Sequence, residues 1–217
     1  LAIDHHPSQE FFARETCLDA GRAACGELVL DIAEQLGPIT PDIAVPLYVA
    51  VSTDTGCFQY SNVTGNTLRA AAELKDLGAD TYPINKVMFG TKTIARLRLE
   101  AALTESVEFY AGGLVGVCTM TQALLNRVGA DSNDTDDISG FARGIEGVQI
   151  GVMIQELKEG GAKISLRTGE DYNASAICAE LGGGGHKAAA GATDPDGTEQ
   201  AKKRILEAIA HSGVELG

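Results

Sequence analysis

The chain has 217 residues, with 17 lysines and arginines against 30 aspartates and glutamates, so its formal net charge is −13 at pH 7. This length suffices for one large domain or two small domains with buried cores. So acidic a composition disfavours binding to long duplex nucleic acid, because such binding depends on the neutralisation of phosphates by Lys and Arg.

The distribution of apolar residues and cysteines narrows the class further. No apolar run approaches the roughly 18 residues that a membrane span needs, so no membrane partner is expected. The five cysteines are scattered and form no Cys-x-x-Cys pair. Such a pattern is typical of reduced thiols, and it predicts a cytoplasmic protein without a disulfide framework.

The first half of the sequence predicts helices and strands in alternation. The apolar residues 1–3 are typical of the end of a buried strand, and a second strand is predicted at 57–63. Helical patterns with capping residues cover 19–35, 40–51, 64–77 and 91–105. The last of these helices is expected to carry the chain into the next domain.

The second half predicts a compact unit with a mixed sheet. In chain order we expect a strand within 107–120, a helix at 121–128, a partly mobile polar loop at 130–140, a hairpin over 148–168, and helices at 173–181 and 198–210. The fold class is therefore α/β. An N-terminal domain with a parallel sheet is predicted over 1–105, and a smaller α/β domain with a mixed sheet over 106–217.

Two short polar stretches in the first half are candidates for chemistry. Asp4, His5 and His6 follow the first strand, and open α/β sheets place their ligands at such strand ends. Polar packing is the ordinary alternative for a His pair. Asp54 lies in the stretch Ser-Thr-Asp-Thr-Gly at the end of the second predicted helix, where an ordinary turn is the alternative.

The third candidate is a run of four glycines, 182–185, followed by His186 and Lys187. Consecutive glycines sacrifice backbone entropy, and they commonly allow backbone amides to approach an anion. The run therefore favours a pocket for a phosphate or a carboxylate. A flexible glycine-rich turn is the alternative.

The sequence Asp-His-His after an apolar strand, "STDTGCFQYSNVT" and "GGGGHKAAAG" occur in this order, and together they resemble the DHH phosphoesterase superfamily. More narrowly, the chain is similar to the bacterial oligoribonuclease and 3'-phosphoadenosine 5'-phosphate (PAP) phosphatase group, which carries a C-terminal DHH-associated domain. This resemblance implies hydrolysis of short oligoribonucleotides and 3',5'-bisphosphonucleotides to mononucleotides. It also implies two divalent ions, Mn²⁺ in most members and Mg²⁺ as the alternative.

The resemblance also implies roles for individual residues. His5 and Asp54 match metal ligands of the family. Asp4 would orient ligands from behind, and His6 would contact the substrate phosphate, which makes these two the catalytic candidates. In the second domain, the family pattern implies that the substrate is bound by Arg167, Gly183, Gly184, Gly185 and His186.

One departure from the family pattern is large. Members carry an Asp-x-Asp motif and a further aspartate ahead of the Asp-His-His motif, and the present sequence starts at that motif. We therefore expect a truncated catalytic domain that is inactive alone. A homodimer is left open, as are three other functions: a single-strand exonuclease, a cyclic-dinucleotide phosphodiesterase, and a non-catalytic nucleotide-binding module.

Overall fold

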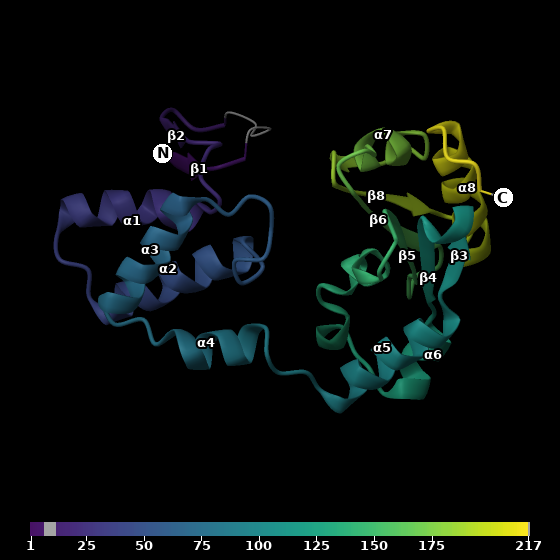
Figure 1. The fold of residues 1–217 in the computed structure, drawn as a ribbon, viewed down its shortest axis with the longest axis horizontal. Coiled ribbons are helices and arrows are strands. Elements are labelled where there is room, and N and C mark those ends of the chain that lie inside the picture. The colour runs from purple at the N-terminus through teal and green to yellow at the C-terminus, as the bar shows by residue number, and fades with distance from the viewer. Residues whose placement is uncertain (7–11, 217) are drawn as a thin grey trace. The chain divides into compact units, whose positions relative to one another are not determined.

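The computed structural model describes residues 1–6 and 12–216. The chain divides into two compact units, Leu1–Thr91 and Lys92–Gly217 (Figure 1). Both contain helices and strands, so the predicted α/β class is confirmed. Among the described residues, no helix combines the length and the apolar character needed to cross a membrane.

The first unit consists of a small parallel sheet and four helices. Strands β1 (Ala2–Asp4) and β2 (Thr16–Leu18) pair in parallel. The helices are α1 (Cys25–Leu36), α2 (Pro41–Asp54), α3 (Gly65–Asp76) and α4 (Thr81–Met88). A capping box between Thr64 and Thr67 starts α3, as the sequence pattern predicts. The core of this unit contains Leu30, Tyr48, Val51 and Leu74, all almost fully buried.

Several parts of the first unit differ from the prediction, including strand β2, which no sequence pattern indicates. Helix α1 begins at Cys25 rather than at 19, because the Asp19 carboxylate accepts the Gly21 N–H and the chain turns there. The strand predicted at 57–63 is a series of turns, in which Cys57 and Phe58 have positive φ values of 55° and 65°. Helix α4 was not predicted, since it is short and contains Pro83.

The second unit is built on one six-stranded mixed sheet. Its strands are β3 (Glu108–Tyr110), β4 (Val115–Met120), β5 (Ile150–Glu156), β6 (Ala162–Thr168), β7 (Gly184–His186) and β8 (Ala189–Asp194). They lie in the order β3-β4-β5-β6-β8-β7. Only β4 and β5 pair in parallel, so the mixed sheet is confirmed, and β5 and β6 form the predicted hairpin.

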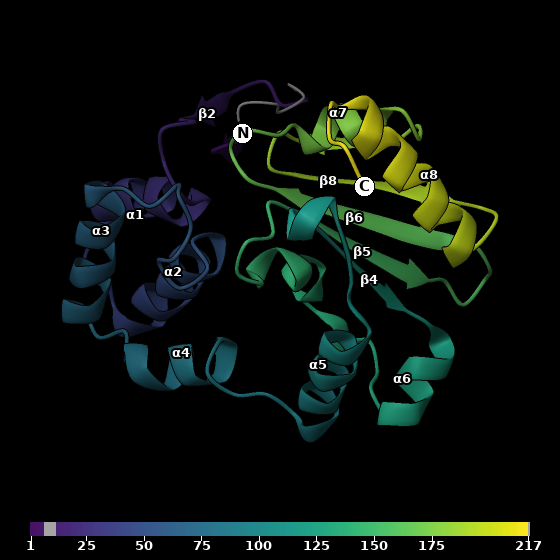
Figure 2. The ribbon, with the colours of Figure 1, turned by 45° about the vertical axis from the view of Figure 1, so that its right-hand side comes forward.

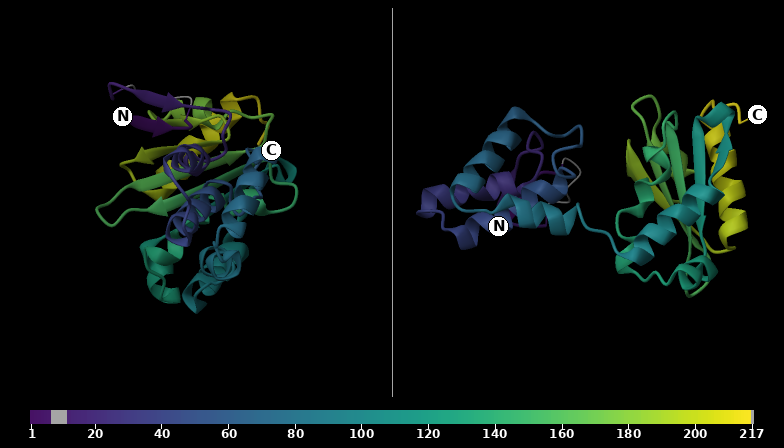
Figure 3. Two further views of the ribbon diagram at one scale, coloured as in Figure 1. Left: turned by 90° about the vertical axis from the view of Figure 1, so that its left-hand side faces the viewer. Right: turned by 60° about the horizontal axis from the view of Figure 1, so that its bottom comes forward.

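The two faces of this sheet have different coverings. Helices α7 (Ala174–Ala179) and α8 (Thr198–His211) pack on one face through Ile177, Ile205 and Ile209 (Figure 2). We call this the α8 face, and the sheet seen edge-on shows α8 along that side (Figure 3). The opposite face, called the α5 face, is covered in part by α5 (Ile94–Ser106), α6 (Gln122–Val128) and short 3₁₀ turns.

Helix α5 belongs to the second unit, whereas the sequence analysis placed residues 91–105 in the first domain. Leu99 and Leu103 of α5 are fully buried and pack with Cys118 and Met120 of β4. This packing, rather than a change in composition, places the division of the chain ahead of α5.

The polar segment 130–140 has a defined conformation, although its composition predicts partial mobility. It contains two 3₁₀ turns, Asn133–Thr135 and Ile138–Gly140. The Arg96 guanidinium of α5 donates hydrogen bonds to the carbonyl oxygens of Asp134, at 3.0 Å, and Asp136, at 2.5 Å. Thr93 also donates to the Asp134 carboxylate, so α5 holds the segment in place.

Candidate metal centre and nucleotide-binding surface

The Asp-His-His motif forms a compact cluster at the end of β1. Asp4 Oδ1 accepts hydrogen bonds from the backbone N–H groups of His5, at 2.7 Å, and His6, at 3.1 Å. The same oxygen lies 2.7 Å from Nδ1 of His6. This bond to His6 holds the pKa of Asp4 below its usual value. Ligand atoms of all three residues lie within 4.8 Å of one another, so the cluster has the dimensions of a metal-binding group.

His5 is oriented toward Asp54. Its Nδ1 lies 3.2 Å from the carbonyl oxygen of Arg22, which can only accept, so the neutral ring carries its proton on Nδ1. Nε2 is then the free ligand nitrogen, and it lies 3.6 Å from Oδ2 of Asp54. Adjacent ligands of an octahedral ion with bonds of about 2.1 Å lie about 3.0 Å apart, and opposite ligands about 4.2 Å apart. The distance of 3.6 Å lies between these values, so a small adjustment of either side chain would let both bind one cation.

A tight turn presents Asp54, the last residue of α2. The next residues include Gly56, Cys57 and Phe58, all with positive φ. A Cβ at Gly56 would lie 2.3 Å from the Tyr60 ring, so this turn requires glycine. Asn62 Nδ2 donates to the carbonyl oxygen of Asp54 at 3.2 Å, which ties the end of α2 to the turn.

A buried carboxylate supports the same site from α1. Glu27 is 1% exposed; its Oε1 accepts from the Ala23 N–H at 3.1 Å and from Thr67 Oγ1 at 3.0 Å. Its Oε2 lacks a hydrogen-bond partner among the described residues and lies 3.6 Å from Nη1 of Arg22. Glu27 thus holds the segment whose Arg22 carbonyl orients His5. No sequence motif predicts this role of Glu27, although an acidic residue among the apolar residues of α1 is a signal of a buried polar contact.

In the second unit, Arg167 lies on β6 with its guanidinium already anchored. Nη2 donates to Ser139 Oγ at 2.9 Å, and Nη1 donates to the Leu166 carbonyl oxygen at 3.1 Å. Ser139 belongs to the second 3₁₀ turn, which follows Asp137 with φ of 57°. The segment held by α5 therefore fixes the position of Arg167.

The glycine run forms part of a hairpin rather than a loop. Gly184 and Gly185 lie with His186 in the edge strand β7, which pairs with β8, and all three are exposed. The N–H groups of Gly182 and Gly183 donate to the carbonyl oxygens of Ala179 and Cys178 at the end of α7. These two amides are therefore engaged within the domain and do not point to an anion in this conformation.

Packing accounts for some glycines of the run and not for others. A Cβ at Gly183 would lie 2.2 Å from the Gly191 carbonyl oxygen. Gly185 has φ of 149°, and a Cβ there would lie 2.6 Å from the Ala189 carbonyl oxygen. Gly184 has no other atom within 4 Å of its Cβ position. Gly184 is therefore the glycine of β7 that folding does not explain.

The sheet register brings the candidates of the second unit together. Arg167 lies opposite Ala189, and Ala189 lies opposite His186 on its other side. Because opposite residues of paired strands share a face, Arg167 and His186 flank a small alanine on the α5 face. The first unit likewise brings Asp4, His5, His6 and Asp54 together.

Comparison with known proteins identifies a known domain family within the second unit. Residues 117–212 match the family model described as the DHHA1 domain. The chain is 35% identical over its whole length to the bifunctional oligoribonuclease and PAP phosphatase NrnA of Thermus thermophilus, and it covers 65% of that protein. A probable bifunctional oligoribonuclease and PAP phosphatase of Streptococcus mutans is 26% identical over 88% of this chain, which covers 61% of that relative.

A solved structure extends the likeness to three dimensions. An exopolyphosphatase-related protein from Bacteroides fragilis superimposes with a TM-score of 0.88 at 26% identity, covering 96% of this chain and 62% of that protein. Residues 117–212, the greater part of the second unit, therefore resemble a DHHA1 domain. The resemblance of the whole chain to the DHH oligoribonuclease and PAP phosphatase group is confirmed. The chain spans just under two thirds of the length of the curated relatives described above.

Proposed function

We propose that these residues contribute the metal-binding and substrate-binding groups of a phosphoesterase that hydrolyses short oligoribonucleotides and 3',5'-bisphosphonucleotides to mononucleotides. The observation that carries this proposal is the pair formed by His5 Nε2 and Asp54 Oδ2 at 3.6 Å, with the imidazole oriented by a backbone carbonyl. The similarity to relatives named oligoribonuclease and PAP phosphatase supports the substrate class.

The first unit would supply the metal chemistry. His5 and Asp54 would hold a divalent ion, and a mixed imidazole and carboxylate set suits Mn²⁺ better than Mg²⁺, which prefers oxygen ligands. Such an ion, when bound, lowers the pKa of a water ligand and stabilises charge on phosphate oxygens. His6 would contact the substrate phosphate, while Asp4, bonded to its Nδ1, would fix the orientation of its ring.

The second unit would bind the substrate. Arg167 would bind a phosphate through guanidinium N–H groups that its bonds to Ser139 and Leu166 leave free. Gly184 would let the nucleotide approach the edge strand closely, because no side chain occupies that position. His186 would contact the same phosphate or its neighbour from β7. Gly183 and Gly185 would shape this surface by allowing β7 to lie close to β8.

The described residues provide one metal-binding group, and its chemistry limits the number of ions. Asp4, His5 and His6 are the described residues that cluster as ligands, and Asp4 is already engaged by three hydrogen bonds. Several carboxylates are needed to offset the charge of two divalent ions and to bridge them. We therefore expect these 217 residues to bind one Mn²⁺ weakly and to hydrolyse neither substrate at a useful rate.

Calorimetric titration with Mn²⁺ tests the metal site, with His5→Ala as the variant and His211→Ala as the control. His211 lies exposed on α8 of the other unit. We expect weak binding in the parent and the control and none in His5→Ala. Binding that survives in His5→Ala would contradict the assignment.

Nucleotide binding and turnover then separate the possible functions. The parent chain is incubated with a ribodinucleotide, a 3',5'-bisphosphonucleotide, a longer single strand and a cyclic dinucleotide, with and without Mn²⁺. Binding of the first two in preference to the others supports the proposal. Preference for a strand much longer than a tetranucleotide would favour an exonuclease, and preference for the cyclic ligand would favour a cyclic-dinucleotide phosphodiesterase. Metal-independent binding by a chain that binds no Mn²⁺ would favour a non-catalytic nucleotide-binding module.

A further inference from the structure

We propose that Lys163 and Thr193 form a second phosphate-binding subsite on the second unit, next to the surface that contains Arg167 and His186. The subsite would bind a phosphate of an oligonucleotide longer than a dinucleotide, so it would set a preference for chain length. This inference rests on the proposed function, because it extends the same nucleotide-binding surface.

The sheet register places Lys163 on the right face. Lys163, Ser165 and Arg167 alternate along β6, and their side chains therefore share the α5 face. Lys163 lies directly opposite Thr193 of β8, just as Arg167 lies opposite Ala189. Ser165, between the two cations on this face, is buried, so a ligand that reaches both has to pass over a covered position.

A groove lies beside Lys163 where the edge strand stops. β7 pairs only with residues 189–191 of β8. Beyond that point the groove has a volume of about 360 Å³ and is lined by polar, small and apolar residues, with Ile164 and Ala192 among them. Its lining includes Lys163, Thr193, Leu181, Gly182, Gly183 and Gly191. The groove therefore lies between Lys163 and the turn that contains Gly182 and Gly183, ahead of β7.

The charge of Lys163 is available for a ligand. The lysine ion pairs among the described residues involve Lys92 and Lys202, and Lys163 is exposed. In a chain with a net charge of −13, a cation without a carboxylate partner next to a groove favours an anionic ligand. The Thr193 hydroxyl, also exposed, would add a hydrogen-bond donor.

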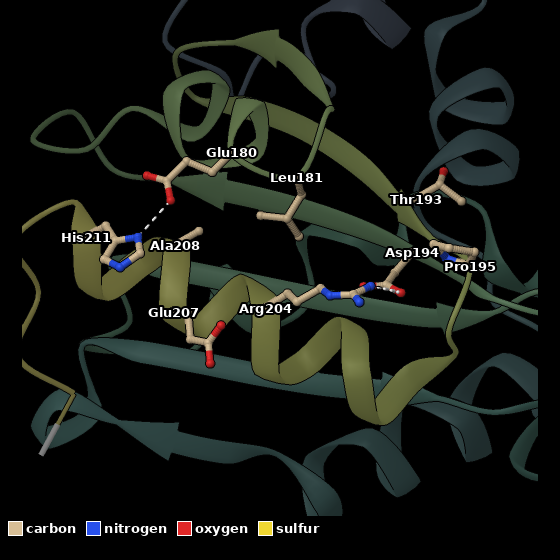
Figure 4. Close-up of a pocket in the computed structure, with 9 residues that line it drawn as sticks. All are labelled: Glu180, Leu181, Thr193, Asp194, Pro195, Arg204, Glu207, Ala208 and His211. Carbon is tan, nitrogen blue, oxygen red and sulfur yellow. Dashed lines mark hydrogen bonds and ion pairs between the residues drawn. The ribbon is translucent and has the colours of Figure 1, made fainter.

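A neighbouring cavity of similar size shows what a phosphate site should not contain. It lies on the α8 side, also has a volume of about 360 Å³, and shares Leu181 and Thr193 with the groove (Figure 4). Its cation, Arg204, is bound by Asp194 at 2.8 Å and by Asp196 at 2.7 Å. Glu180 and Glu207 add further negative charge, so this cavity does not suit a phosphate.

The spacing along β6 connects the subsite with chain length. Residues four apart on a strand are separated by about 13 Å, so Lys163 lies well beyond a phosphate held at Arg167. Arg167 is also fixed by Ser139 and cannot follow a ligand toward Lys163 without losing that bond. A ligand with one internucleotide phosphate would occupy the Arg167 position, and a longer strand would reach both Arg167 and Lys163.

The test compares ligand lengths in the parent chain and in Lys163→Met, which removes the charge and keeps most of the stem. The matched control is Lys203→Met, an exposed lysine on α8. Dissociation constants for a ribodinucleotide and a ribotetranucleotide are measured by calorimetry in EDTA, so that no hydrolysis occurs. For Lys163→Met we expect about five- to tenfold weaker tetranucleotide binding and a change of less than about twofold for the dinucleotide. The salt dependence of tetranucleotide binding should also decrease by about one phosphate contact.

The variant Thr193→Val provides a second test of the subsite, and the pattern of affinities separates failure of the subsite from failure of the proposed function. Thr193→Val should weaken tetranucleotide binding about two- to threefold, since it removes one hydrogen bond at an exposed position. If Lys163→Met loses affinity equally for both lengths, or for neither, the subsite is contradicted while the proposed function stands. If the parent chain binds neither nucleotide, the proposed function itself fails, and the subsite fails with it.

Discussion

The two units position their candidate residues by different means. In the first unit, His5 and Asp54 come from the ends of a strand and a helix, and a buried carboxylate and a left-handed turn hold these ends. In the second unit, Arg167 and His186 occupy regular positions on paired strands. The candidate metal centre therefore depends on a few specific polar contacts, whereas the candidate nucleotide-binding surface depends on strand register and small residues.

This difference predicts where each site is vulnerable. Removal of a buried polar partner leaves other groups unsatisfied in a low-dielectric interior, which is costly. A strand tolerates changes on its exposed face, and it tolerates them poorly where backbones approach closely. The four predictions below run from the largest expected effect to the smallest.

Replacement of Glu27 should have the largest effect. Glu27→Ala removes the acceptor for Ala23 and Thr67 and the carboxylate next to Arg22, so the first unit should lose about 3 kcal/mol of stability. Mn²⁺ binding should weaken as well, since the segment that orients His5 is released. Urea unfolding followed by circular dichroism measures the loss. Glu34→Ala, on the exposed side of α1, is the control and should change stability by less than about 0.5 kcal/mol. Equal unfolding midpoints for Glu27→Ala and the control would contradict the role given to Glu27.

Two neighbouring glycines form a matched pair for the second unit. Gly183→Val would place a side chain against the Gly191 carbonyl and should cost about 1 to 3 kcal/mol of stability. A valine side chain at position 184 would face open space, so the stability of the Gly184→Val variant should stay within about 0.5 kcal/mol of the parent. Its nucleotide affinity should decrease at least about tenfold. Thermal unfolding and calorimetry measure the two quantities. Unchanged nucleotide affinity in Gly184→Val would remove this position from the binding surface.

Arg167→Lys tests whether the guanidinium is needed for phosphate binding. Lysine keeps the positive charge but lacks the planar fork, and it cannot bond Ser139 and a phosphate in the same way. We expect about tenfold weaker binding of a ribodinucleotide, which corresponds to about 1.4 kcal/mol. Arg98→Lys, exposed on α5, is the control for the same exchange. Retention of the parent affinity by Arg167→Lys would show that Arg167 serves only to hold Ser139.

The smallest effect concerns pH. His211 Nδ1 lies 2.9 Å from Glu180, which raises the pKa of His211 above its ordinary value, with Glu207 contributing in the same direction. A raised pKa in the folded state gives stability that is complete below the unfolded pKa and is lost as the pH rises through the folded pKa. Between pH 6 and pH 8 the parent should therefore lose about 1 °C of melting temperature relative to His211→Gln, because the pair is exposed. Parallel melting curves at both pH values would contradict the effect.

The sequence predicted those parts of the fold that have strong local signals. Thr64 caps α3 as expected, the hairpin of β5 and β6 turns at the predicted glycines, and the α8 helix matches its pattern. The strand prediction for residues 57–63 is wrong. Their aromatic and β-branched composition favours a strand, but the Gly56 turn holds Cys57 and Phe58 in a left-handed conformation. Local propensity there is overridden by the turn that presents Asp54.

The remaining features depend on tertiary contacts that no local sequence pattern predicts. Strand β7 consists of two glycines and a histidine, so its existence follows only from the close approach of β8. The positions of Asp4, His5, His6 and Asp54 in one cluster agree with the resemblance to the phosphoesterases, and their roles stay predictions. Glu27 accepts hydrogen bonds from Ala23 and from Thr67. Thr67 is forty residues away along the chain, and no local sequence pattern encodes such a contact.

The placement of the histidines has a practical consequence for magnetic resonance. The chain contains four histidines: His5 and His6 in the cluster, His186 on β7, and His211 paired with Glu180. A single imidazole spectrum would therefore observe the candidate metal centre, the candidate nucleotide-binding strand and an imidazole outside both candidate sites at once. Addition of Mn²⁺ should broaden the signals of His5 and His6, and addition of nucleotide should shift the signal of His186. The His211 resonance would serve as the internal standard for both titrations.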